Sequence, residues 1–269
     1  MTNFKYALGC RKSPPDSRDR RLTALPPTLR PVIPASVDYT PMMSPVSNQG
    51  SEGTCVGFAV VDGMKEYQEK AEWKKLVHLS ARYVYHNAQK IDPWDDDSIE
   101  GTDIRSAMKV LNKLGVPPAS CWKYKPHQTD SPCPNADELA APNRISEYVY
   151  LETLNEMRES LFINGPFVAG VQVYGYAWGN AEKTGKIHMP GPDDDFAGGH
   201  AICIVGYDNK THYFKFKNSW GRKWGASGYG YIPYAYLRKY SNDCWSGKDL
   251  LADKKVQAFI QTVLAKRRR

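Results

Sequence analysis

Cys55 is the residue in this sequence whose surroundings best suit nucleophilic chemistry. It follows a turn that contains Gly50 and Gly53, and the apolar residues after it recur at helical spacing, at Val56, Ala59, Val60, Met64 and Tyr67. This spacing puts Cys55 in the first turn of a helix. The partial positive charge and unpaired N–H groups of a helix N-terminus favour a thiolate and lower a cysteine pKa. The sequence therefore predicts an activated thiol at this position.

Two later stretches contain polar residues that could assist a thiolate. A cysteine nucleophile needs a proton partner, and the carbonyl oxygen it attacks needs hydrogen-bond donors for its developing negative charge. His200 stands at the edge of one β-type apolar run and Asn218 at the edge of another, while Gln49 lies six positions before Cys55. We expect the histidine and the asparagine to face the thiol from a sheet.

Three segments together resemble the papain-like cysteine peptidases, and they occur in the order typical of that family. They are Gln49-Gly50 with Cys55, Gly199-His200-Ala201 with Val205-Gly206-Tyr207, and Lys217-Asn218-Ser219-Trp220-Gly221. The resemblance runs from about Pro34 to the last third of the chain. It implies an endopeptidase in which Cys55 is the nucleophile, His200 the acid and base, and Asn218 the residue that orients the imidazole. It also implies that Gln49 donates an N–H to the oxyanion.

Two departures from the family pattern lie beside the nucleophile. Glu52 stands where the family usually has a cysteine, and Val56 stands where it usually has an aromatic residue. Changes of this kind resemble bacterial members of the family. We therefore expect the disulfide common near the active site to be missing and the catalytic chemistry to be kept.

The resemblance also implies where an extended peptide substrate would bind. Gly101 and Thr102 match a glycine pair whose backbone pairs with the substrate like an added strand, although threonine replaces the second glycine. Trp220 resembles the tryptophan that shields the His–Asn hydrogen bond. Gly199 precedes the predicted base in the same motif.

The pocket for the substrate's second residue would be walled by two small residues. These are Gly170 and Ala201, so a bulky apolar side chain could enter. The base of the pocket is expected from the region around residues 242–245. An acyl-transferase or an amidase could use the same catalytic residues, and a non-catalytic binding homologue remains a further alternative. A non-catalytic homologue predicts the loss of a catalytic position, and none of the four is lost.

The order of predicted elements favours an α+β fold, with helices first and strands later. Helices are expected after Ser80, from about 104 to 114 and over 153–162, and strands over 167–173, 201–207, 213–217 and 229–233. The resemblance implies a papain-like fold of two lobes with the active-site cleft between them. The helical lobe would span about 34–143, and the antiparallel, barrel-like sheet lobe about 144–248.

Residues 1–33 differ in composition from the rest of the chain. Five prolines interrupt this basic segment, so it cannot form a long helix or a central strand and is predicted to be extended. In papain-like enzymes the segment before the mature start blocks the cleft, and residues 34–39 resemble that start. Our hypothesis is a propeptide-like strap, an intramolecular inhibitor that covers the substrate groove. The alternative is an arm that only packs on the surface.

The net charge of +7 in 269 residues is a mild basic excess. Basic residues cluster at Arg18, Arg20 and Arg21 and at residues 266–269, which could meet an anionic partner or be solvated termini. Residues 249–269 form an amphipathic pattern with a basic end, which predicts a helix that packs on the core or, less simply, meets a partner or a membrane surface. No apolar run is long enough for a secretory signal or a membrane span. The sequence thus predicts a soluble and, by default, cytoplasmic protein, with export by another route left open.

The cysteines favour free thiols over a disulfide framework. Six are present, and setting Cys55 aside for chemistry leaves an odd number, which argues against systematic pairing. A bridge between Cys121 and Cys133 remains an alternative. The spacing of cysteine and histidine residues matches no zinc motif, so no metal or other cofactor is predicted.

Overall fold

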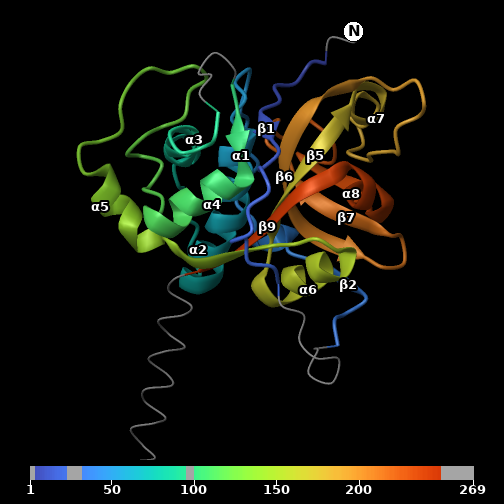
Figure 1. Cartoon of the computed structure of the whole chain (residues 1–269), viewed down its shortest axis with the longest axis horizontal. Helices are drawn as coiled ribbons and strands as arrows, with labels where there is room; N and C mark the ends of the chain where they lie inside the picture. The colour runs from blue at the N-terminus through green and yellow to red at the C-terminus, as the bar shows by residue number, and fades with distance from the viewer. Residues whose placement is uncertain (1–3, 23–31, 95–99, 250–269) are drawn as a thin grey trace, which may run out of the picture.

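A computed structural model describes residues 4–22, 32–94 and 100–249 of the chain (Figure 1). Its α-helices are α1 (Cys55–Phe58), α2 (Glu66–Trp73), α3 (Ala81–Gln89), α4 (Ile104–Lys113), α5 (Ala136–Ala140), α6 (Leu154–Asn164), α7 (Gly175–Gly179) and α8 (Tyr234–Tyr240). A π-helix, η3 (Ala59–Lys65), joins α1 to α2, and η2 (Thr40–Met42) and η4 (Ala141–Asn143) are 3₁₀ turns. The strands are β1 (Cys10–Arg11), β2 (Ser36–Asp38), β3 (Thr102–Asp103), β4 (Ile145–Tyr150), β5 (Phe167–Tyr174), β6 (Phe196–Asp208), β7 (Tyr213–Lys217), β8 (Tyr229–Pro233) and β9 (Ser241–Asp249).

The strands form one large antiparallel sheet and one short parallel pair. The sheet has seven strands in the order β4-β9-β5-β6-β7-β8, with β2 paired to β6. The parallel pair joins β1 to β3. In Figure 1 helices α1 to α5 lie on one side of the molecule, and most of the sheet lies on the other with α6, α7 and α8. The prediction of an α+β fold with an antiparallel sheet is confirmed.

Each of the central strands contributes to two hydrophobic cores. In β5, Val168 belongs to the core shared with the helices, whereas Phe167 and Ala169 belong to a second core with α6, α7 and α8. In β6, Cys203 and Ile204 divide in the same way. Successive side chains of a strand point to opposite faces, so the sheet separates the two cores. The helical part thereby packs against one face of β5 and β6, and β6 carries His200.

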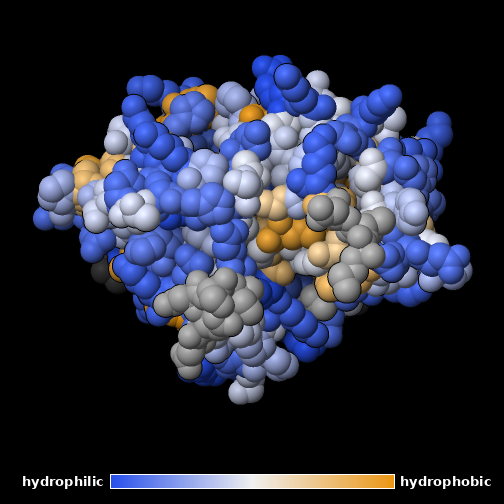
Figure 2. Space-filling view, turned by 90° about the horizontal axis from the view of Figure 1, so that it is seen from above, coloured by the Kyte–Doolittle hydropathy of each residue, from blue (hydrophilic) through white to orange (hydrophobic). Residues whose placement is uncertain are grey.

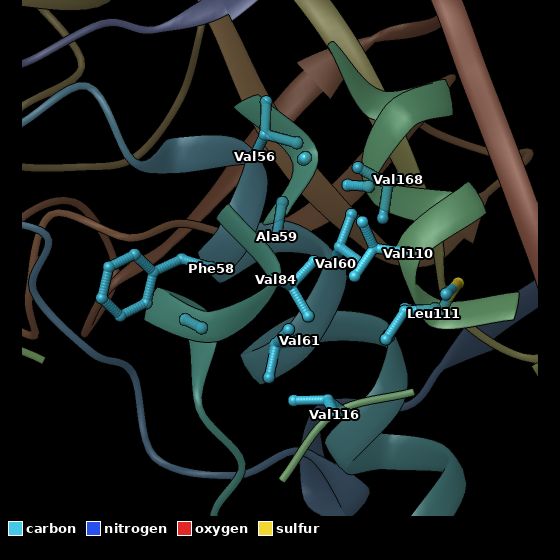
Figure 3. Close-up of a cluster of buried hydrophobic side chains, with 14 of the residues drawn as sticks. Val56, Phe58, Ala59, Val60, Val61, Val84, Val110, Leu111, Val116 and Val168 are labelled. Atoms are coloured by element: carbon cyan, nitrogen blue, oxygen red, sulfur yellow. The ribbon is translucent and has the colours of Figure 1, made fainter. Parts of the chain in front are cut away.

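The core of the helical part is built mainly from branched aliphatic side chains (Figure 3). The labelled residues are Val56, Phe58, Ala59, Val60, Val61, Val84, Val110, Leu111, Val116 and Val168. All of them are at most 5% exposed. They come from α1, η3, α3, α4, the segment after α4, and β5. This packing fixes the helix that begins with Cys55 against the neighbouring helices and the sheet.

Helix starts and strand positions largely follow the predictions. Ser80 caps α3 by accepting the N–H of Tyr83, and Asp103 caps α4 by accepting that of Ser106. Thr153 begins α6 with a capping box. The strands predicted over 213–217 and 229–233 are β7 and β8, and the other two predicted strands lie within β5 and β6.

The C-terminal part of the sheet was not predicted. Helix α8 and strand β9 follow β8, and β9 lies between β4 and β5. Asp249, expected at the start of a terminal helix, ends β9, where its carboxylate lies 2.7 Å from Lys65 Nζ. The rest of the expected helix, residues 250–269, lies outside the described part of the chain.

The preference for free thiols is wrong for two of the cysteines. Cys121 and Cys133 form a disulfide, with their Cα atoms 5.0 Å apart. Cys10, Cys55, Cys203 and Cys244 are free. Because an odd number of cysteines besides Cys55 says nothing about any single pair, the count could not exclude this bridge.

The helices of the described residues fall short of what a membrane-spanning helix requires. None of the helices in ranges 4–22, 32–94 and 100–249 combines the length and apolarity that a span requires. The face shown in Figure 2 is mainly hydrophilic, with a hydrophobic patch near its middle and smaller spots elsewhere. Scattered apolar surface of this kind is normal on globular proteins.

Candidate active site

Cys55 is the first residue of α1, and its side chain is fully buried. The thiol lies beside the backbone N–H groups of Ala201, Gly9 and Val56, which stabilise its negative form. Burial is the larger effect and raises the pKa of the thiol to about 11. The predicted position at a helix start is confirmed. The predicted lowering of the pKa is wrong for this state, because burial, to which Gly9 of the N-terminal segment contributes, outweighs the effect of the helix start.

His200 lies on β6, and Asn218 directly follows the neighbouring strand β7. His200 Nε2 is 2.8 Å from Asn218 Oδ1. An amide oxygen can only accept, so this contact places the proton on Nε2 and leaves Nδ1 as the basic nitrogen. Nδ1 has no hydrogen-bond partner among the described residues. Burial lowers the pKa of His200 to about 4, against a smaller opposite effect of Asn218, so the imidazole is neutral.

Trp220 covers the histidine and its hydrogen bond to the asparagine. Its ring stacks on that of His200, with centroids 4.4 Å apart and an angle of 21° between the planes. Trp178 meets the same imidazole edge-on at 5.9 Å. Both tryptophans are at most 5% exposed. Excluding water from a hydrogen bond strengthens it, so these rings hold the imidazole in a single orientation.

Gln49 has a fixed orientation that aims its amide nitrogen into the cleft. Its Oε1 accepts a 2.6 Å hydrogen bond from Ser219 Oγ, which leaves Nε2 as the donor. Nε2 donates to Glu52 O at 3.0 Å and to Ala7 O at 3.2 Å. The backbone carbonyl of Ala7 thus accepts from the amide that was expected to donate to a substrate oxyanion.

Residues 4–13, which are part of the predicted strap 1–33, run through the cleft above Cys55. From here on the word strap means residues 4–13 only. Tyr6 stacks on Trp220 at 4.4 Å and 12°. Gly9 N donates to Gly199 O at 3.1 Å, and Gly9 O accepts from Thr102 N at 3.0 Å. The strap is therefore held by backbone hydrogen bonds on both walls of the cleft.

Every residue predicted to bind substrate lies against the strap or the thiol. A Cβ atom on Gly101 would lie 2.3 Å from Gly9 O, and one on Gly199 would lie 2.0 Å from Cys10 O. A Cβ on Gly170 would lie 3.1 Å from Cys10 Sγ. Thr102 and Trp220 contact the strap directly, and the N–H of Ala201 lies beside the thiol. The structure thus brings together residues that are far apart in the sequence.

A buried ion pair stands where the family usually has a cysteine. Glu52 and Arg82 form this pair, and their side chains are only 7% and 9% exposed. Glu52 also accepts hydrogen bonds from Tyr124 OH at 3.1 Å and His127 N at 3.2 Å. The pair joins the loop before the nucleophile to α3, a link that a disulfide at this position would otherwise supply. The sequence contained no signal for it beyond the unusual Glu52.

Replacing Glu52 by alanine is expected to lower the free energy of unfolding by about 3–5 kcal/mol, because it leaves Arg82 buried without its charge partner. Urea unfolding of the variant measures this loss. Glu147→Ala is the matched control, since Glu147 pairs with Lys248 at the surface, where both side chains are more than 40% exposed. That control should lose at most about 1 kcal/mol. Equal losses in the two variants would contradict a structural role for the Glu52 pair.

The arginines expected to attract an anionic partner have internal partners in part. Arg18 forms a two-pronged pair with Asp16, and Arg21 pairs with Glu152. The other basic cluster, residues 266–269, lies outside the described residues. In the ranges that the structure describes, no group of three or more histidine, cysteine or acidic side chains is arranged to hold a metal ion.

Comparisons with known proteins identify the family and the fold. A model of the papain family of cysteine proteases matches residues 33–249. Xylellain, a cysteine protease from Xylella fastidiosa, has a TM-score of 0.81 and 30% identity, over 92% of this chain and 98% of its own. A peptidase C1-like protein of Acanthamoeba polyphaga mimivirus is 28% identical over 90% of this chain and 86% of its own length. A procathepsin B from Trypanosoma congolense shares the fold, with a TM-score of 0.71 and 19% identity over 90% of this chain and 86% of its own. The matched range contains all four predicted catalytic residues.

Proposed function

The chain belongs to the papain family of cysteine proteases and is a peptide hydrolase, and we propose that it is an endopeptidase whose nucleophile is Cys55. His200 acts as base and acid, Asn218 orients the imidazole, and Gln49 stabilises the oxyanion. The observation that carries the proposal is the position of Ala7, a peptide carbonyl that Gln49 Nε2 binds at 3.2 Å in the cleft above the thiol. An extended peptide substrate would be held in the same way.

The chemistry begins with proton transfer between Cys55 and His200, which together are called the dyad. His200 Nδ1 takes the proton of the Cys55 thiol as sulfur attacks the carbonyl carbon, and the oxygen gains negative charge. Gln49 Nε2 and the backbone N–H of Cys55 stabilise that charge. The imidazolium then protonates the leaving amine as the C–N bond breaks. A water molecule, deprotonated by His200, hydrolyses the thioester and returns the thiol.

The strap restrains this chemistry by occupying the cleft. It puts its own carbonyl on Gln49 and its own backbone on Thr102 and Gly199, so a substrate cannot use these groups while the strap is bound. It also dehydrates the dyad, since burial raises the pKa of Cys55 and lowers that of His200. Both groups are then neutral near pH 7. Displacement of the strap would restore water to the dyad and favour the thiolate–imidazolium pair.

Labelling and hydrolysis together test the endopeptidase proposal. An epoxide warhead on a short peptide should modify Cys55 and leave Cys203 and Cys244, both buried away from the cleft, unmodified in peptide mass spectra. A quenched fluorogenic peptide blocked at both ends should be cleaved at an internal bond under reducing conditions. If Cys55 is labelled but the acyl group passes only to an added amine acceptor, the chain is a transferase. If Cys55 is neither labelled nor active after the strap is removed, the proposal is wrong.

A further inference from the structure

Asp62 is a buried acidic residue of the π-helix η3 that the proposed mechanism does not use. In an α-helix the N–H of Glu66 would donate to the carbonyl oxygen of Asp62, four residues earlier. Here it donates to Val61 O, five residues earlier, so Asp62 O does not receive it. The π-helical turn thereby makes a backbone carbonyl available to groups outside the helix. Turns of this kind often occur at functional sites.

Two side chains from other segments donate to this carbonyl. Lys217 Nζ donates to Asp62 O at 2.8 Å, and Ser44 Oγ donates to it at 3.0 Å. Lys217 Nζ also donates to Ser44 Oγ at 2.7 Å. Both side chains belong to buried residues, so little water competes for these hydrogen bonds. Because Lys217 directly precedes Asn218, its ammonium group ties the end of β7 to η3.

The carboxylate of Asp62 holds a third segment, the one that leads to Gln49. Asp62 Oδ2 accepts a hydrogen bond from Ser47 Oγ. Ser47 O in turn accepts from Gly221 N at 2.9 Å, and Gln49 N donates to Ser219 O at 2.9 Å. The backbone from Ser47 to Gln49 is thereby fixed on two sides, by η3 and by the segment that follows β7.

An ionised carboxylate at this position is unfavourable for the fold. Burial and the neighbouring Glu66 raise the pKa of Asp62 to about 7. Lys217, whose ammonium group contacts the backbone carbonyl, opposes this effect only in part. A raised carboxyl pKa means that the folded state disfavours the charged form, so above the ordinary pKa the residue lowers the stability of the fold. A neutral side chain would serve the fold better, which favours a role other than stability.

We propose that Asp62 is a positioning residue for the oxyanion donor Gln49 and that it acts through Ser47. The inference rests on the proposed function. Gln49 Nε2 must lie within hydrogen-bond distance of the oxygen of the tetrahedral intermediate, and a displacement of about 1 Å weakens catalysis. The hydrogen bond from Ser219 fixes the rotation of the Gln49 amide. Asp62 fixes the backbone from which that side chain extends.

The variants Asp62→Ala and Asp62→Asn of the full chain test the proposal through the ratio of two rates. One is hydrolysis of the quenched peptide, which needs the oxyanion donor, and the other is alkylation of Cys55 by iodoacetamide, which forms no oxyanion. Both reactions need an open cleft, so their ratio is independent of how often the strap leaves. Asp62→Ala should lower the ratio by about tenfold or more, with the loss in kcat and not in KM. Asp62→Asn keeps an oxygen that can accept from Ser47 and should retain most of the ratio.

Glu69→Ala is the matched control, because it removes another buried carboxylate a short way along the chain. Glu69 lies on α2, and its Oε1 is 2.6 Å from Lys65 Nζ. This variant should lose thermal stability and keep the ratio. If the ratio is unchanged in Asp62→Ala, or falls equally in Glu69→Ala, the positioning role is wrong. A ratio as low in Asp62→Asn as in Asp62→Ala would also contradict it, because the acceptor oxygen would then not be what matters.

Ser47→Ala removes the same hydrogen bond from its other end, so a failure of Asp62→Ala to fold cannot hide the answer. Ser47 is only half-buried, which makes this the milder change. We expect it to lower the ratio as Asp62→Ala does, and an unchanged ratio would overturn the proposal. A wild-type chain in which iodoacetamide modifies Cys55 but no peptide bond is hydrolysed would instead overturn the endopeptidase proposal. The two failures are therefore distinguishable.

Discussion

Cys55→Ala is expected to abolish peptide hydrolysis, with a loss of about 10⁶-fold in kcat, which is the scale found when a catalytic nucleophile is removed. Without the sulfur, no thioester can form, and the remaining oxyanion donors support only a trace of water attack. The measurement is the initial rate on the internally quenched peptide at saturating concentration, with the wild-type Cys55 and the Cys55→Ala variant both in chains that lack the strap, at equal purity. We expect the variant to be indistinguishable from the uncatalysed reaction within the sensitivity of the assay.

The control for this prediction is a second buried cysteine. Cys203 is fully buried on β6, in the core shared with the helices, and Gly63 packs against its side chain. Cys203→Ala therefore removes a thiol of equal size without touching the cleft, and it should retain most of the activity. A Cys55→Ala variant that hydrolyses peptides at a substantial fraction of the wild-type rate would show that another residue is the nucleophile. Thermal unfolding of both variants would establish that each is folded.

The proposed catalytic residues could be located because each lies in a strong local pattern, while their roles came from the resemblance to the papain family. Cys55 precedes a long helical period, while His200 and Asn218 border apolar strand runs, and the structure places them on α1 and at β6 and β7. Such patterns depend on residues near in sequence, so one sequence suffices to find them. Strands β6 and β7 are antiparallel neighbours with Cys203 opposite Lys217, which brings Asn218 near His200.

The course of the strap could be predicted only as an extended segment over the cleft. Its contacts with Gln49, Thr102 and Gly199 use backbone N–H and C=O groups, which every residue has, so no side-chain pattern reveals which residues make them. The Glu52–Arg82 pair and strand β9 were also missed. They join positions far apart in the chain, and β9 carries too many polar residues to read as a central strand. Their signal exists only in three dimensions.

The electrostatics of the dyad connect the strap to the chemistry. A helix N-terminus favours a thiolate, but in the covered state burial outweighs it, and the pKa of Cys55 is raised to about 11 while that of His200 is lowered to about 4. The Cys55 thiol is neutral below about pH 11, and the His200 imidazole is neutral above about pH 4. Between these two values the residues therefore form no thiolate–imidazolium ion pair. The covered enzyme is therefore expected to be chemically quiet as well as sterically blocked.

Gly9→Ala is expected to release the strap and to raise peptide hydrolysis by the full chain by about tenfold or more, if overpacking has its usual cost. A Cβ atom on residue 9 would lie 2.0 Å from the carbonyl oxygen of Gly53, which is backbone in the loop before Cys55 and cannot move aside cheaply. Gly9 does not have a positive φ, so alanine adds no backbone strain once the strap is out of the cleft. The substitution therefore acts against the bound strap and leaves the catalytic groups unchanged.

The measurement is kcat/KM on the quenched peptide, compared with the rate of Cys55 labelling by the epoxide, since both need an open cleft. Gly191→Ala is the matched control, because a Cβ there meets no atom within 4 Å, and it should leave both rates unchanged. A chain that lacks the strap altogether should be at least as active as Gly9→Ala.

If Gly9→Ala is folded and neither rate rises, the segment is only a packing arm. A rise in labelling without a rise in hydrolysis would instead mean that the strap shields the thiol while something else limits catalysis. A parallel rise in both would identify displacement of the strap as the step that activates the enzyme.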